Sequence, residues 1–174
     1  WRGQMTIPRE LGLKTFPEGI RLVQTPIQGL NTLRGKPARS LKTRSFEIRG
    51  DIEFTAEGET GWKLTAKDGS YTSVGYDATK EQVFVDRTHS GLVAFSDRFP
   101  ARTSAPLPRR KGRLTFDILV DRNSIEVFAD QGRVALTNLI FPEAAPVSFD
   151  FYSTAGATSL PITISPLKSI WSGK

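Results

Sequence analysis

Apolar and polar residues alternate along much of this chain, as expected for β-strands whose two faces meet different surroundings. Phe46, Ile48 and Ile52 alternate with charged residues as far as Phe54, and Gly50 stands where the series requires another apolar residue. This glycine predicts a bulge or a bend within one long strand. Shorter runs with the same alternation are 62–66, 114–120, 125–127, 147–151 and 160–164.

Turn-forming residues separate these runs. Lys67-Asp68-Gly69-Ser70 predicts a tight hairpin, because Asp-Gly favours the positive φ angles that such a turn requires. Asp77–Lys80, Asp121–Asn123 and Asp130–Gly132 predict further turns, and no stretch has a helical period. The pattern therefore predicts an all-β fold, a two-sheet antiparallel β-sandwich of jelly-roll or concanavalin-like type with about eleven strands.

The length of 174 residues suits one domain. Residues 1–13 alternate poorly and include Pro8, so we expect them to form a linker or the last strand of a preceding domain. Residues 14–174 are then the sandwich, with Gly19–Gln24 as its first strand. Because the first residue is Trp1 rather than methionine, we expect the natural chain to begin further upstream.

Composition narrows the possible chemistry. Hydrophobic residues make up 38% of the chain and charged residues 24%, which is typical of a globular domain, and no apolar run is long enough for a transmembrane helix. There is no cysteine, so disulfides, thiolate catalysis and cysteine-bound zinc are excluded. The net charge of +6 and the tract Arg109–Arg113 permit an acidic partner, but no aromatic residues interleave with these charges, so we interpret the tract as a solvated loop.

The carboxylates do not form a recognisable catalytic pair. The alternation places six of them on outward faces of strands, which predicts a solvated sheet surface: Glu47, Asp51, Glu53, Asp117, Glu126 and Asp150. Glu126 and Asp121 flank a hairpin near Arg122, so we expect a structural ion pair there. His89 is the only histidine and is interpreted as a residue of a surface turn. We therefore expect no catalytic residue, no metal site and no cofactor.

Exposed aromatic rings are the remaining candidates for binding carbohydrate, because sugars stack on such rings. The candidates are Trp62, Tyr71, Tyr76, Tyr152 and Trp171, of which the first three are the preferred carbohydrate contacts. Trp62 and Tyr76 share the parity of the apolar residues in their strands, however, and this favours packing in the core for both. From the residues alone, the chain is a β-sandwich of undefined role.

Several strings occur in the order found in one enzyme family. They are Trp1–Leu11, Gly19–Pro26, Val74–Asp77, Val83–Thr88 with Ser90-Gly91, Val120–Phe128, Gly132-Arg133 and Leu139–Pro142. On these strings the chain resembles the C-terminal part of glycoside hydrolase family 32, which contains the levanases, inulinases and invertases. The resemblance extends from Trp1 to about Trp171 and is strongest to levanases and other exo-acting fructan hydrolases.

The resemblance implies a β-sandwich that packs against a five-bladed catalytic propeller and does not itself hydrolyse sugar. The family's retaining mechanism uses Asn-Asp-Pro, Glu-Cys and Arg-Asp-Pro motifs, and none of the three occurs in this sequence. No catalytic residue is therefore carried over. The resemblance also implies a secreted, bacterial parent enzyme, a β-fructofuranosidase whose substrates are fructans.

The matched strings invite structural roles for two repeated elements. Asp86-Arg87 and Asp121-Arg122 both follow a valine at the end of a strand. We expect at least one of these aspartates to pair with an arginine or to accept hydrogen bonds from the amides of a turn.

Three functions remain open from the sequence. The preferred one is an accessory domain that supports the catalytic propeller of the same chain. The alternative is a carbohydrate-recognition domain that binds levan, inulin or a terminal fructose. A remote alternative is polyanion binding through Arg109–Arg113 and the Lys36–Arg44 region, although nucleic acid and membrane are not expected partners.

Overall fold

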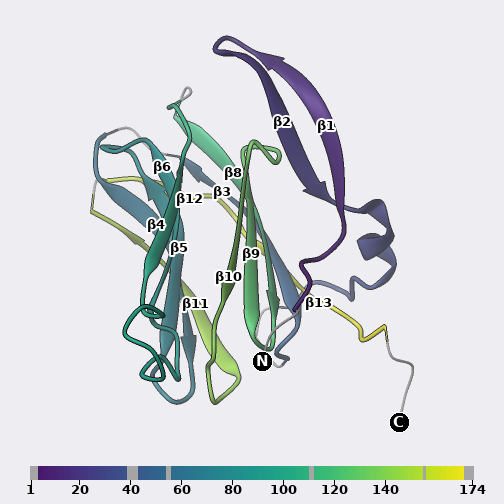
Figure 1. The fold of residues 1–174 in the computed structure, drawn as a ribbon, viewed down its shortest axis with the longest axis vertical. Coiled ribbons are helices and arrows are strands. Elements are labelled where there is room, and N and C mark those ends of the chain that lie inside the picture. The colour runs from purple at the N-terminus through teal and green to yellow at the C-terminus, as the bar shows by residue number, and fades with distance from the viewer. Residues whose placement is uncertain (1–3, 39–42, 54–55, 110–111, 155, 171–174) are drawn as a thin grey trace.

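A computed structural model describes residues 4–38, 43–53, 56–109, 112–154 and 156–170. Within these residues the chain forms thirteen strands and one short 3-10 helix, so the predicted all-β class is confirmed (Figure 1). The strand count exceeds the expected eleven, partly because the N-terminal segment and a two-residue strand near the C-terminus add to it.

Two antiparallel sheets form the sandwich. The five-stranded sheet has the order β11-β4-β5-β6-β7. Its strands are β4 Glu59–Ala66, β5 Tyr71–Asp77, β6 Gln82–His89, β7 Arg102–Pro106 and β11 Pro146–Ser153. The six-stranded sheet has the order β10-β9-β8-β3, and two short strands pair with the free edge of β3. Its strands are β3 Phe46–Glu53, β8 Arg113–Asp121, β9 Ser124–Ala129, β10 Val134–Leu139, β12 Thr158–Ser159 and β13 Thr163–Pro166.

The turns between neighbouring strands have the predicted chemistry. Gly69 has a φ of 84° between β4 and β5, and the Asp68 carboxylate accepts a hydrogen bond from the Ser70 amide at 3.0 Å. The Asp68 carboxylate also accepts hydrogen bonds from the Ser70 hydroxyl and from the amides of Glu143 and Ala144. These bonds lower the pKa of Asp68, and the bond from the Ser70 hydroxyl has the largest effect. The hairpin predicted at 67–70 is therefore confirmed.

The structure contradicts the bulge that was one of two alternatives at Gly50, and it contradicts the core position that the alternation gives to Val147. β3 contains no bulge, because its pairing with β8 is unbroken across Gly50. The glycine instead makes room for Ile162, since a Cβ atom at residue 50 would lie 2.7 Å from the Cγ2 atom of Ile162. The irregularity is in β11, where the register shifts between Pro146 and Ser148 and leaves Val147 56% exposed rather than in the core.

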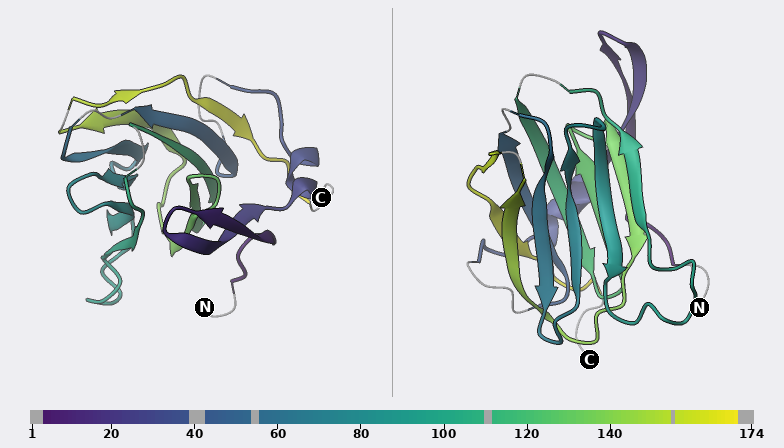
Figure 2. Two further views of the ribbon diagram at one scale, coloured as in Figure 1. Left: turned by 90° about the horizontal axis from the view of Figure 1, so that it is seen from above. Right: turned by 90° about the vertical axis from the view of Figure 1, so that its left-hand side faces the viewer.

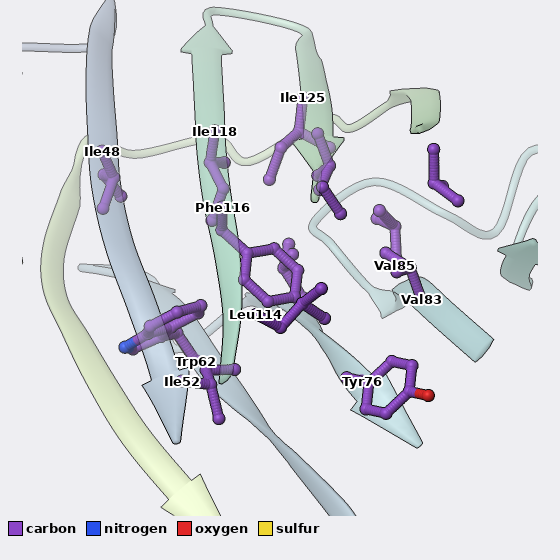
Figure 3. Packing of buried hydrophobic residues seen from close by; sticks show 14 of the residues in the cluster. Ile48, Ile52, Trp62, Tyr76, Val83, Val85, Leu114, Phe116, Ile118 and Ile125 are labelled. Atoms are coloured by element: carbon purple, nitrogen blue, oxygen red, sulfur yellow. The ribbon is translucent and has the colours of Figure 1, made fainter. Parts of the chain in front are cut away.

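The main core lies between the two sheets (Figure 3). Trp62 is its largest fully buried side chain, with its ring edge-on to Phe116 at 5.3 Å between centroids and stacked on Phe149 at 5.6 Å. Ile48 and Ile118, which pair across β3 and β8, are completely buried in the same cluster. The alternation seen in the sequence therefore identifies this core correctly.

The N-terminal segment forms a two-stranded sheet of its own. β1 Arg9–Phe16 pairs with β2 Gly19–Pro26, and the 3-10 helix η1 Gln28–Thr32 follows. The hairpin joins neither sheet and extends beyond the end of the sandwich (Figures 1 and 2). Residues 9–13 are thus strand rather than linker, and β1 runs across the boundary expected between residues 13 and 14. The assignment of this segment to one domain or another stays a prediction.

A second, smaller apolar cluster covers the outer face of the six-stranded sheet. Leu119 and Phe128 point outward from β8 and β9 and are buried beneath Leu30 of η1. Partly buried residues of the N-terminal segment, the η1 region, β10 and the C-terminal segment complete the cluster: Ile7, Leu33, Ala135 and Leu167. The six-stranded sheet is therefore covered on both faces, and this determines where its charged side chains lie.

Candidate functional site

Two of the three preferred sugar contacts are core residues. Trp62 is 1% exposed and Tyr76 is 2% exposed, so neither ring offers a face to a ligand. The Tyr76 hydroxyl donates a hydrogen bond to the carbonyl oxygen of Leu107 at 2.8 Å, and burial raises the pKa of Tyr76 to about 12. Sugar contact is therefore wrong for both residues, and the packing favoured by their parity is confirmed.

Tyr71 lies at the surface but its ring already has neighbours. It stacks on His89 with 4.7 Å between ring centroids, and the Lys63 ammonium lies 4.2 Å from its centroid. His89 is the last residue of β6 rather than part of a turn, and it is exposed. Sugar contact by Tyr71 stays a prediction. The Tyr152 hydroxyl donates to Glu59 at 2.8 Å, whereas Trp171 is outside the described residues.

The expectation of a solvated carboxylate surface was wrong for two residues. Glu47 and Glu126 are 1% and 4% exposed, because η1 and the N-terminal segment cover the outer face of their sheet. Glu126 does not pair with Arg122. Its carboxylate accepts hydrogen bonds from the Arg9 guanidinium at 2.7 Å and from the Ile7 amide at 2.8 Å. The ion pair therefore binds the N-terminal segment to β9.

A second group of charged side chains lies on the same face, around the buried Glu47. The Arg34 guanidinium donates to both oxygens of Glu47, and Arg49 bridges Glu47 at 3.1 Å and Asp117 at 3.3 Å. Burial, together with the negative charge of Glu47, raises the pKa of Asp117 to about 7. One oxygen of Asp117 is buried without a hydrogen-bond partner. Two carboxyl groups and two arginines thus form one network under η1.

The geometry of this network differs from that of a glycosidase carboxyl pair. A retaining glycosidase needs two carboxyl groups that flank a bound glycosidic bond. Both oxygens of Glu47 are occupied by Arg34, and the side chain is closed to solvent. Asp117 has the raised pKa of a candidate acid, but its nearest carboxylate cannot reach a substrate.

In the repeated Val-Asp-Arg strings, Asp121 stabilises the turn after β8, whereas Asp86 stabilises an irregular part of strand β6, where the pairing with β5 shifts register. The Asp86 carboxylate accepts bonds from the Thr88 amide at 3.0 Å and the Thr88 hydroxyl at 2.7 Å. The Asp121 carboxylate accepts a bond from the Arg122 amide at 2.8 Å and from Ser45 at 2.5 Å. The turn-amide role expected for at least one aspartate is confirmed.

The arginine that follows Asp86 has a different role. Arg87 lies 4.4 Å from the ring centroid of Phe99, and burial lowers its pKa. Its Nε atom is buried without a hydrogen-bond partner. The guanidinium is therefore used for cation–π packing on the loop between β6 and β7.

Two of the basic residues suggested for polyanion binding have partners within the chain. Arg113 pairs with Asp51, and Arg44 donates to the carbonyl oxygen of Glu143 at 2.6 Å. Residues 39–42 and 110–111 are outside the described ranges.

The functional residues that sequence reasoning missed are Arg9 and Arg34. Arg9 lies 117 positions from its partner Glu126, so no spacing in the sequence could link them. Arg34 follows a short 3-10 helix that the alternation did not predict. The only signal in the sequence was a set of acidic residues on one sheet face, and a solvated face explained that set equally well.

A cleft of about 540 Å³ lies between the segment 25–34 and the outer face of β3, β8 and β9. Its polar lining includes Gln28, Asn31, Arg34, Arg49 and Asp117. These side chains offer guanidinium and amide donors beside carboxylate acceptors, a combination that suits a ligand with several hydroxyl groups. No group of three metal-ligating side chains and no helix long and apolar enough to span a membrane occurs in the described ranges.

Comparison with known proteins places this architecture in one family. The family model "Glycosyl hydrolases family 32 C terminal" matches residues 20–168. The chain is 37% identical to a levanase of Bacillus sp. (strain L7), over 98% of this chain and 21% of that protein. It is 36% identical to an extracellular exo-inulinase of Aspergillus awamori, over 91% of this chain and 33% of that protein.

The solved structures agree. The crystal structure of exo-inulinase from Aspergillus awamori superposes with a TM-score of 0.86 and 32% identity, and the match covers 98% of this chain and 37% of that one. The chain therefore spans between about a fifth and two fifths of the length of these relatives. The matched part is their C-terminal domain.

Proposed function

Because this chain belongs to the C-terminal domains of glycoside hydrolase family 32, we propose that it is a non-catalytic accessory domain that packs against and stabilises a catalytic propeller in the same parent protein. The parent is proposed to be a retaining β-fructofuranosidase that acts on fructans such as levan or inulin. Secretion of the parent is proposed as well, since one relative is named an extracellular exo-inulinase.

The observation that carries the proposal is how the buried carboxylates are used. Glu47 and Glu126 each accept bonds from an arginine that covers the sheet, which leaves neither carboxylate accessible to a sugar. Buried ion pairs of this kind fix the position of the elements that carry them. The charges of this domain therefore hold its outer layer in place, as an accessory domain requires.

The test measures association with the catalytic part of the parent. The 174-residue chain and the separately produced catalytic part are mixed and studied by calorimetry and thermal denaturation. We expect association and a higher melting temperature for the catalytic part. Absence of association, with both melting temperatures unchanged, would contradict the proposal.

A hydrolysis assay provides the second test. The 174-residue chain, incubated with levan, inulin and sucrose, is expected to release no fructose, whereas the parent protein releases it. Fructose release by the chain itself, at a rate that stays constant through successive purification steps, would contradict the non-catalytic role.

The cleft between residues 25–34 and the six-stranded sheet favours one second candidate, binding of fructan. Its guanidinium and amide donors match the hydroxyl groups of a terminal fructose. Titration with levan and inulin should then produce heat, and Arg49→Ala should abolish that heat, whereas Tyr71→Ala tests the surface ring instead. Titrations without heat for either polymer would exclude this candidate.

A further inference from the structure

The β1–β2 hairpin presents an unusually apolar face to solvent. Leu13 and Leu22 are directly opposite each other in the antiparallel pairing, and Leu11 and Ile20 lie next to them on the same face. All four are exposed: Leu11 by 67%, Leu13 by 75%, Ile20 by 63% and Leu22 by 49%. Large exposed apolar residues that adjoin one another usually mark an interaction surface.

The opposite face of the hairpin is the one attached to the sandwich. Phe16 packs against the Arg133 guanidinium at 4.4 Å from its ring centroid, and Val23 is buried. The Gln24 amide donates to the carbonyl oxygen of Gly132 at 2.9 Å. The hairpin is thus held to the turn between β9 and β10 by one face, and the leucine face is turned away from that turn.

A two-stranded hairpin is marginal in water unless further surface packs against it. This hairpin extends past the end of both sheets, so the sandwich itself does not cover the leucine face (Figures 1 and 2). We infer that the face formed by Leu11, Leu13, Ile20 and Leu22 is the surface on which the catalytic part of the parent protein docks. The inference rests on the proposed accessory function.

Position along the chain favours this occupant over a second copy. The matched relatives are several times longer, and the family model that matches this chain is described as C-terminal, so the proposed catalytic part would precede this domain in the parent protein. Residues 4–8 lie immediately before β1 in the chain, so β1 is the first strand after the proposed catalytic part. The covalently joined neighbour is therefore always close to the hairpin, which gives it a high effective concentration.

Hydrogen exchange provides the first test. The amides of β1 and β2 are compared in the 174-residue chain and in the parent protein. We expect at least tenfold slower exchange of the β1–β2 amides in the parent, with β5 unchanged. Equal exchange of the hairpin in both proteins would overturn the inference.

A pair of variants provides the second test. The double variant Leu13→Ser/Leu22→Ser is compared with Val147→Ser, which removes from β11 an aliphatic side chain whose exposure, 56%, lies between those of the two leucines. In the parent, the double variant should lower the melting temperature of the catalytic part by several degrees, and Val147→Ser should not. In the 174-residue chain, circular dichroism should show both variants folded with unchanged melting temperatures.

The outcomes separate this inference from the proposed function. If the unsubstituted domain and the double variant stabilise the catalytic part equally well, the docking surface lies elsewhere and only the inference fails. If the domain has no effect on the catalytic part, the proposed function fails. If the 174-residue chain sediments as a dimer that Leu13→Ser/Leu22→Ser dissociates, a second copy covers the face and the inference is wrong.

Discussion

Arg9 and Glu126 illustrate how single residues position a whole segment. Their side chains are 17% and 6% exposed, and the Glu126 carboxylate also accepts bonds from Ile7 and Thr137. Loss of the arginine leaves a buried carboxylate with its charge uncompensated, whereas loss of both charges removes that penalty. The pair therefore fixes the path of the N-terminal segment across β9.

We expect Arg9→Met to lower the free energy of unfolding by about 3 kcal/mol. The double variant Arg9→Met/Glu126→Gln should recover at least half of that loss, because the glutamine still accepts a bond from the Ile7 amide. Urea denaturation measures both. A loss below about 0.5 kcal/mol for Arg9→Met would show that the pair behaves as an exposed one.

Asp117 makes stability depend on pH in the direction opposite to most carboxylates. Its pKa of about 7 in the folded protein lies above the ordinary value of about 3.9. The folded state therefore retains a proton that the unfolded chain releases, and stability falls as the pH rises from about 4 to about 7.

The variant Asp117→Asn should remove this dependence. At pH 8 we expect this variant to be more stable than the unsubstituted 174-residue chain by about 2–4 kcal/mol. At pH 4 the two should be nearly equal in stability. Urea denaturation at several pH values measures the difference. Parallel stability curves for the two proteins between pH 4 and pH 8 would show that the Asp117 carboxyl titrates normally.

At the scale of elements, the attachment of the hairpin depends on Gly132. This residue has a φ of 84°, and a Cβ atom there would lie 2.1 Å from the carbonyl oxygen of Gln24. Gly69 has the same φ but open space around it. A substitution at Gly69 therefore measures the backbone strain alone, whereas one at Gly132 adds the steric clash.

We expect Gly69→Ala to cost about 1 kcal/mol, the usual price of a left-handed conformation for a residue with a Cβ atom. Gly132→Ala should cost about 1–2 kcal/mol more, because β2 must move away from the turn between β9 and β10. Hydrogen exchange of the Gln24 amide should accelerate only in Gly132→Ala. Equal effects of the two substitutions on stability and on Gln24 would show that the close approach has no energetic role.

The elements also show what the sequence could and could not predict. Alternation identified the strands of the main core, because residues such as Ile48, Trp62 and Ile118 have one buried face and a polar opposite face. It misassigned Val147, because the register shift in β11 reverses the parity that the pattern assumes. For residues 9–13 of β1 the sequence left linker and strand as alternatives, because the leucines of this strand face solvent and do not belong to the core pattern.

The candidate site was less predictable than the fold, for a physical reason. The burial of Glu47 and Glu126 is caused by the N-terminal and η1 segments that cross the outer sheet face. Such long-range cover leaves no periodic mark on the strands beneath it. Parity correctly favoured packing for Trp62 and Tyr76, since that depends only on their own strands.

At the scale of the whole molecule, the six-stranded sheet separates two apolar interfaces. One is the main core against the five-stranded sheet, and the other is the small cluster beneath η1 and the N-terminal segment. Adjacent residues of β8 report on them separately, because Ile118 points into the main core and Leu119 points into the outer cluster. Both side chains are buried, so the two substitutions are matched in position and differ in the interface they disturb.

We expect Ile118→Ala to lower the free energy of unfolding by about 3–4 kcal/mol and Leu119→Ala by about 2–3 kcal/mol. The decisive difference is local. Leu119→Ala should accelerate hydrogen exchange of the Ile7 amide, which bonds to Glu126 beside the cluster, while the amides of β5 keep their protection under native conditions. Because the outer layer also carries the leucine face of the hairpin, its loosening should weaken docking of the catalytic part without unfolding the sandwich. Acceleration of β5 and Ile7 by the same factor would show instead that the outer layer and the main core open as one cooperative unit.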